Sequence, residues 1–200
     1  MYMSKQVIVA ICREYGSLGH HIARKLAERL QIDLYDKEIL LEKAEKDGFD
    51  KEIFEQYDEK KRNFFFSRTV NGFSNSIEDI IAEKTFEFQR ELADSGKSFV
   101  VVGRCCDYVL RDNPNAVRIF ICGDYDTKLQ HLINDDHLSP KEAADTISKQ
   151  DKNRKMYHNL YCDTKWGDSR AYDMTINSSK FGIDKTVDIL YDMVKRYFDL

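Results

Sequence analysis

The chain has 200 residues, of which 42% are hydrophobic and 33% are charged, and its formal net charge is −4 at pH 7. This length suits one domain with a substantial buried core, and the composition, with only two prolines, is typical of ordered, soluble proteins. The negative charge argues against a general nucleic-acid binder, and no segment approaches the ~18 apolar residues that span a bilayer. We therefore expect a cytoplasmic protein without nucleic-acid or membrane partners.

The five cysteines show neither a metal-binding nor a disulfide pattern. None forms a C-x-x-C pair, Cys105 and Cys106 are adjacent, and Cys12 and Cys122 lie within apolar runs. Thiols in such places are typically buried and reduced. We expect free thiols and no metal held by them, because the ligand spacings of zinc sites are missing.

Continuous apolar runs predict buried parallel strands, since strands covered on both faces do not alternate with polar residues. The three long runs are Val7–Cys12, Phe99–Gly103 and Val117–Cys122, and two shorter candidates are Leu34–Tyr35 and Tyr172–Ile176.

Apolar residues at helical spacing predict helices between these strands. The three stripes consist of Ile22, Leu26 and Leu30, of Ile77, Ile81, Phe88 and Leu92, and of Ile183, Val187, Leu190 and Val194. A further helix is expected from Ser139 to about Tyr161, because the letters SPKE are typical of a capping box with proline in the first turn. Strands alternating with helices predict a parallel sheet with helices on both faces, and such sheets bind ligands at the carboxyl ends of the strands.

Residues 13–21, REYGSLGHH, form the turn between the first strand and the first helix. The P-loop pattern is G-x-x-x-x-G-K-[ST], and with Gly19 as its second glycine Glu14 takes the place of the first. His20 then stands in the lysine position and His21 in that of the hydroxyl residue. The side chains therefore lack both the fixed charge and the Mg²⁺-binding hydroxyl of a P-loop.

The backbone of this turn favours an anion nonetheless. Gly16 and Gly19 allow close approach, Ser17 can cap the helix that begins near Leu18, and the free amides of the helix start face the turn. Because the two histidines are adjacent on a helix, they point about 100° apart and cannot both face a phosphate. The alternative is a tight turn in which the glycines only permit the geometry.

Five stretches in this order resemble the cytidylate kinase-like family, a divergent branch of the P-loop nucleoside monophosphate kinases. They are ICREYGSLGHHIARKLAERL, LYDKEIL, VVGRCCDYVL, DKNRKMYHNLY and WGDSRAYDMTINSSKFGIDKTVDIL. The resemblance runs nearly end to end and is weakest at about 47–76. It implies one P-loop kinase-like domain, 1–200, with a three-layer α/β/α fold and a five-stranded parallel sheet. The implied core is 1–36, 97–136 and 171–200, with a helical acceptor-binding insertion at about 37–96 and a lid at about 137–170.

The resemblance also implies roles for single residues. Those that would surround the donor phosphates of ATP are Glu14, Tyr15, Gly16, Ser17, Leu18, Gly19, His20 and His21. Asp36 would lie near the acceptor nucleotide and Mg²⁺, and Arg104 would contact the acceptor phosphate, with Asp107 also at the substrate. Arg154, in a D-x-x-R stretch, would neutralise charge on the transferred phosphoryl group, and Arg13 would approach the phosphates. Arginine suits these catalytic roles through its planar, bidentate fork.

Each of these assignments has a structural alternative. Asp36 could cap the helix that follows it, or do both. Arg104 could pair with a surface carboxylate. Arg154 could lie on a solvated helix face on which Asp151 pairs with Lys155.

The expected function is ATP- and Mg²⁺-dependent phosphoryl transfer to a small phosphorylated acceptor, foremost a nucleoside monophosphate such as CMP. The altered loop supports an alternative, a non-catalytic protein that binds or senses nucleotides. A third interpretation is a structural dimerisation domain that uses the aromatic segment NFFFSRTVNGF, residues 63–73, as a homodimer interface. The first two depend on main-chain amides of the turn being available to an anion.

Overall fold

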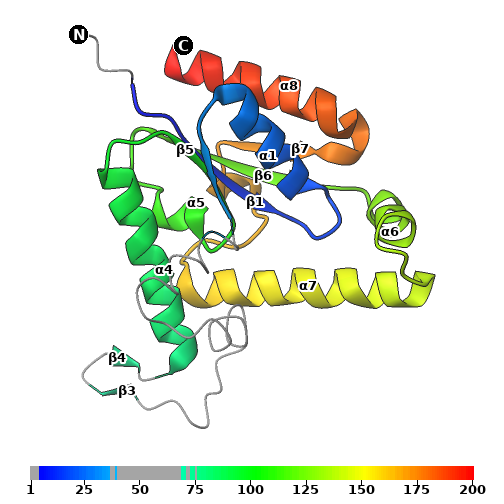
Figure 1. The fold of residues 1–200 in the computed structure, drawn as a ribbon. Coiled ribbons are helices and arrows are strands. Elements are labelled where there is room, and N and C mark those ends of the chain that lie inside the picture. Colours follow the sequence, from blue (N-terminus) through cyan, green and yellow to red (C-terminus); the bar gives the residue numbers. More distant parts are fainter. Residues whose placement is uncertain (1–4, 37–38, 40–68, 71–72, 75) are drawn as a thin grey trace.

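The computed structural model describes residues 5–36, 39, 69–70, 73–74 and 76–200 (Figure 1). At its centre lies a five-stranded sheet in the order β2-β5-β1-β6-β7, in which every pairing is parallel. Its strands are β1 Ile8–Arg13, β2 Asp33–Tyr35, β5 Phe99–Val102, β6 Ala116–Cys122 and β7 Met174–Asn177. The predicted five-stranded parallel α/β fold is confirmed.

The three long strands match the continuous apolar runs to within one or two residues. In the register, Val9 stands beside Val100 on one side and Val117 on the other, and all three are fully buried. Gly103 falls outside β5 because its φ of +79° turns the chain away from the sheet. Tyr172 also falls outside its predicted strand, since it follows a 3₁₀ turn and β7 starts only at Met174.

Helices cover both faces of the sheet. α1 Gly19–Leu30 and α8 Ser178–Phe198 lie on one face of the sheet (Figure 1). They pack there against the side chains of Val9 and Ile11. On the other face, α4 Ile77–Asp94 and the short α5 Cys106–Val109 cover Ile8, Ala10 and Cys12. The predicted stripes are largely inside, although Ile77, at the start of α4, is 40% exposed.

Two further helices, α6 Tyr125–Asn134 and α7 Pro140–Tyr161, follow β6 and pack against each other. Leu132 of α6 and Ile147 of α7 form a small buried cluster, against which Tyr15 of the β1–α1 turn packs. These two helices therefore meet the turn at the carboxyl ends of the strands. Within the described part of the chain, no helix has the length and apolarity needed to cross a membrane.

The segment before α4 contributes one described feature, an antiparallel pair of β3 Thr69–Val70 and β4 Phe73–Ser74, which the sequence analysis did not predict. Most of the aromatic segment 63–73 and most of the helical insertion between 37 and 76 lie outside the described residues. The homodimer and the domain boundaries therefore stay predictions.

The N-terminus of α7 shows the predicted capping box. The Ser139 hydroxyl accepts a hydrogen bond from the Glu142 amide at 3.3 Å, and the Glu142 carboxylate accepts one from the Ser139 amide at 3.0 Å. Two amides that the helix itself cannot satisfy thus gain acceptors, so the long helix that follows starts at a defined residue.

Replacing Ser139 with alanine should lower the free energy of unfolding by about 1 kcal/mol, because the first turn of α7 loses its acceptor. Denaturant titration measures this change. Ser148→Ala is a matched control, since this serine is exposed in the middle of the same helix, where alanine is the better helix former. Equal stabilities of the two variants would contradict the capping role.

Candidate active site

The turn between β1 and α1 combines two left-handed residues. Gly16 has a φ of +76°, and Leu18, with a φ of +57°, occupies the N-cap position of α1. The prediction that Ser17 caps this helix is wrong. The Ser17 hydroxyl instead donates to the carbonyl of Glu14 at 2.8 Å, and its side chain is buried inside the turn.

The carbonyl groups of the turn point into the protein. The hydroxyl of Ser178, at the start of α8, donates to the Ser17 carbonyl at 2.7 Å. Nδ1 of His131, in α6, lies 3.0 Å from the carbonyl oxygen of Gly16. Both contacts engage carbonyl oxygens of the turn and therefore do not occupy its amides.

The amides from Gly16 to His21 have no acceptor among the residues that the structure describes. The two preceding amides are engaged: that of Glu14 donates to the Ile121 carbonyl at 3.0 Å and that of Tyr15 to Asp151 Oδ1 at 2.6 Å. Successive amides in such a turn, at the positive end of a helix, attract anions. The backbone requirement of the predicted phosphate loop is therefore met.

These amides border a cleft of about 360 Å³. Its lining residues are Arg13, Glu14, Tyr15, Gly16, Leu18, Gly19, His20, His21, Asp36, His131, Leu132, Asp135, Asp136 and Arg154. The cleft thus lies at the carboxyl ends of β1 and β2, where parallel sheets bind ligands. It also brings together Arg13, Asp36 and Arg154, which are far apart in the sequence.

The histidine in the lysine position is paired with a carboxylate. Nε2 of His20 lies 2.8 Å from Oδ2 of Asp36, and Oδ1 of Asp36 accepts the amide of Ile39 at 3.3 Å. Both expected roles of Asp36 are therefore compatible, since it accepts a backbone amide and also lines the cleft. His21 lines the same cleft, with its ring tilted by 55° to that of His20.

The three predicted arginines converge beside the turn. Arg154 donates from Nη1 to the Arg13 carbonyl at 3.1 Å, and its guanidinium lies 5.4 Å from the centre of the Tyr15 ring. Arg104 is only 6% exposed and lines, together with Arg13 and Arg154, a smaller hollow next to the cleft. A solvated helix face for Arg154 is therefore wrong, whereas the pairing of Arg104 with a carboxylate stays a prediction.

Asp107 differs from its expected place at the substrate. It is 1% exposed and does not line the cleft; its carboxylate accepts hydrogen bonds from His158 Nε2 at 2.8 Å and from the Cys12 thiol at 3.1 Å. The reason is its position in the first turn of α5, which packs onto the sheet rather than facing the cleft. Asp107 thus fastens α7, through His158, to the core.

The buried contact between Asp107 and His158 shifts pKa values in its surroundings. Burial alone would lower the pKa of His158, but the hydrogen bonds to Asp107 and Cys162 raise it to about 10. Hydrogen bonds from Cys105 and then His158 outweigh burial and lower the pKa of Cys162 to about 7. All five cysteines are free, and Cys12, Cys106 and Asp107 bring their ligand atoms within 4.8 Å of one another.

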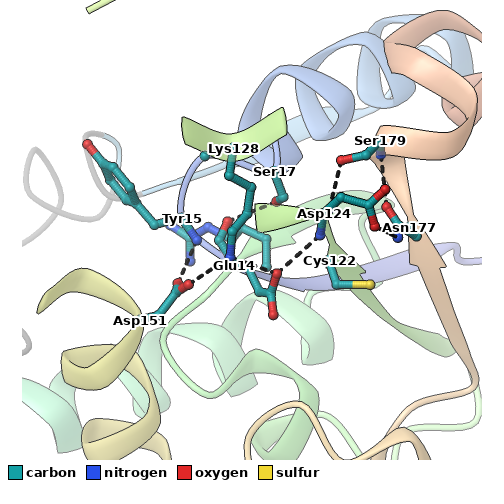
Figure 2. A network of polar contacts seen from close by, with 12 residues as sticks. Glu14, Tyr15, Ser17, Cys122, Asp124, Lys128, Asp151, Asn177 and Ser179 are labelled. Atoms are coloured by element: carbon teal, nitrogen blue, oxygen red, sulfur yellow. Dashed lines mark hydrogen bonds and ion pairs between the residues drawn. The ribbon is translucent and has the colours of Figure 1, made fainter. Parts of the chain in front are cut away.

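The sequence analysis missed Lys128, a residue of α6 that is 6% exposed. Its Nζ lies 3.0 Å from Glu14 Oε2 and 3.1 Å from Asp151 Oδ2, as Figure 2 shows. Asp151 therefore pairs with Lys128, which contradicts the alternative in which Asp151 pairs with Lys155. One signal did exist, because Lys128 follows the carboxyl end of a predicted strand closely.

The fold is that of a P-loop kinase. The structure resembles a shikimate kinase from Bacteroides thetaiotaomicron, at a TM-score of 0.55 and 14% identity, over 94% of this chain and 98% of that one. A shikimate kinase from Acinetobacter baumannii in complex with shikimate also gives a TM-score of 0.55, at 13% identity, over 96% and 95%. At these identities the likeness shows the fold alone.

The chain belongs to the cytidylate kinase-like family, whose sequence profile matches residues 8–180. The predicted resemblance is thus confirmed. A cytidylate kinase from Thermoplasma acidophilum is 28% identical over 125 residues, which are 57% of this chain and 66%, just under two thirds, of that protein. The crystal structure of an uncharacterized protein from Eubacterium ventriosum has a TM-score of 0.76 and 38% identity, over 95% of this chain and 99% of that one. Family and fold together support nucleotide-dependent phosphoryl transfer in general.

Replacing His158 with glutamine should destabilise the protein in a pH-dependent way. Its folded pKa, about 10, lies above the value near 6.5 of an unfolded histidine, so its stabilising contribution is complete below about pH 6.5 and is lost as the pH rises towards 10. We expect His158→Gln to cost about 3–5 kcal/mol at low pH, as for a broken buried ion pair, and less at high pH.

Denaturant titrations of both proteins across this pH range measure the difference. His137→Asn is a suitable control, because His137 is exposed and its left-handed φ of 56° is one that asparagine tolerates. A cost of His158→Gln that stays constant or grows with pH would contradict a charged His158.

Proposed function

We propose that the protein is an ATP- and Mg²⁺-dependent kinase that phosphorylates a nucleoside monophosphate, with CMP as the leading candidate. One observation carries the proposal: the amides from Gly16 to His21, in the turn that borders the cleft, have no acceptor among the described residues, and Arg154 lies beside the turn. Phosphoryl transfer requires little more than positioning and charge neutralisation, and this site offers both.

The donor phosphates would bind to the amides of the turn. The lysine of a P-loop is missing here, and its charge would be supplied by the guanidinium groups of Arg13 and Arg154, which line the cleft. A guanidinium stays charged at all relevant pH values and bridges two phosphate oxygens in its fork. His20 would add charge only when protonated.

The residues of the cleft fit a magnesium ion. Mg²⁺ prefers oxygen ligands and keeps several waters, and the Asp36 carboxylate lines the cleft with 11% of its side chain exposed. Asp36 would hold the ion with the donor phosphates, and His21 offers no oxygen in its place. When bound, the ion neutralises charge on the phosphates.

The acceptor would bind next to the smaller hollow, where Arg104 follows the turn at Gly103. The guanidinium of Arg104 would hold the acceptor phosphate. Asp107 would act indirectly, by fixing α7 through His158. The preference for CMP rests on the family and on the cytidylate kinase of Thermoplasma acidophilum. Much of the proposed acceptor-binding insertion lies outside the described residues.

A specific observation favours a second candidate, a nucleotide-binding protein without turnover. The His20–Asp36 pair, at 2.8 Å, engages both the residue in the lysine position and the proposed magnesium ligand. A ligand would have to compete with this pair. If the pair persists, the site would bind a nucleotide without transferring its phosphoryl group.

Purified protein with ATP, Mg²⁺ and a panel of nucleoside monophosphates should form a diphosphate, fastest with CMP. Arg154→Met should reduce kcat by about 10²–10⁴-fold with a smaller loss of ATP affinity, because its charge acts mainly on the moving phosphoryl group. Lys155→Met, an exposed neighbour on the same helix, is the matched control. Binding of nucleotide by calorimetry without transfer to any acceptor would establish the second candidate instead.

Replacing Gly19 with alanine tests the loop itself. A Cβ there would stand 2.6 Å from Cβ of Arg13, so the turn has to shift and its amides lose their common direction. We expect ATP affinity, measured by calorimetry, to fall at least about tenfold, the loss of one charge-assisted hydrogen bond. Gly96→Ala is the control for backbone strain outside the loop, because the φ of +75° at Gly96 disfavours a side chain although a Cβ there meets nothing within 4 Å. Unchanged ATP affinity in Gly19→Ala would place the nucleotide elsewhere.

A further inference from the structure

The contacts of Lys128 connect three segments at the carboxyl edge of the sheet. Its ammonium group lies between Glu14 of the turn and Asp151 of α7, and only 7% of its side chain is exposed (Figure 2). Burial alone would lower the pKa of Lys128, but the two carboxylates outweigh it and raise the pKa. The lysine is therefore charged, and both partners are needed to offset its burial.

Each carboxylate of this triad also binds a main-chain amide. Asp151 Oδ1 accepts the amide of Tyr15 at 2.6 Å, and Glu14 Oε2 accepts that of Gly123 at 3.1 Å. The triad thus fixes the backbone of the loop and the turn after β6 as well as the side chains. α6 is itself fixed at its start, where Asp124 bonds to Asn177 and Ser179 (Figure 2).

The position of Arg154 follows from that of Asp151. The two residues are three apart on α7, so they share one face of the helix. With Asp151 held on the Tyr15 amide, Arg154 reaches the Arg13 carbonyl and lies beside the Tyr15 ring. An α7 released from Lys128 would lose this register, and the guanidinium would leave the phosphate site.

The triad also accounts for a glutamate where a P-loop has glycine. Without Lys128, the carboxylates of Glu14 and Asp151 would face each other next to a site that must accept phosphate, and all three charges would repel. The lysine stem packs here too, since a Cβ at Gly16 would lie 3.1 Å from Cβ of Lys128. One buried cation therefore both neutralises and shapes the loop.

We propose that Lys128 is a positioning residue, which clamps the phosphate loop to α7 through Glu14 and Asp151 and so holds Arg154 in place. The lysine is not among the residues that line the cleft, so it would act through its two carboxylate partners. Lys128 thereby orders the conformation of the phosphate loop from outside the cleft. In a P-loop, the lysine within the loop provides part of this order. The consequence for catalysis rests on the proposed kinase function, whereas the clamp itself does not.

The clamp is tested in the unliganded protein by NMR hydrogen exchange at the Tyr15 amide. Lys128→Met keeps a stem of similar length without charge and should speed this exchange at least tenfold, while Lys128→Arg should restore protection. Lys25→Met is the matched control, because Lys25 forms an exposed ion pair with Asp184. Should Lys128→Met not fold, Asp151→Asn serves instead. Unchanged exchange in the variant that folds would overturn the clamp, whatever the activity of the wild type.

Kinetics then test the positioning of Arg154. Lys128→Met should lower kcat at least tenfold with a smaller change in the KM for ATP, and Lys128→Arg should recover most of it. A merely structural lysine would lower the amount of folded enzyme without this split between kcat and KM. Faster exchange with unchanged kcat would overturn the link to Arg154. A wild type that transfers no phosphate would refute the proposed function, and the exchange experiment would still decide the clamp.

Discussion

The proposed phosphate site would depend on the electrostatic attraction between an anion and backbone amides that have no acceptor among the described residues. Between Gly16 and His21 the described structure leaves such amides open to a cleft, at the positive end of α1. Such an attraction would come from the main chain, so it does not require the P-loop lysine that His20 replaces here. The neighbouring arginines would complement these amides, because a guanidinium beside a bound phosphate neutralises the charge of that phosphate.

Much of the fold could be predicted because its signals are local. A strand buried on both faces needs an unbroken apolar run, and β1 and β6 have one. The capping signal for the start of α7 lies within four residues, Ser139 to Glu142, and the helix begins at this signal in the structure. The predicted end of β5 was one residue too late, because Gly103 extends the apolar run although its backbone turns away from the sheet.

The details of the site depend on contacts between distant segments, which a single sequence does not reveal. Ser17 was expected to cap α1, but Leu18 adopts the left-handed conformation at that position and Ser17 turns inward. Asp107 was expected at the substrate, but the packing of α5 points it to His158. Lys128 is one of 31 lysines and arginines, and nothing local marks it as the partner of Glu14.

The inward carbonyls of the turn have a thermodynamic consequence. Ser178 and His131 hold the peptide groups of Ser17 and Gly16 by their oxygen atoms, so the orientation of the opposite amides is fixed by the folded core. A ligand that arrives meets a rigid receptor, and little conformational entropy is lost when it binds. A polyphosphate should accordingly bind to a preformed site, without the ordering of a flexible segment.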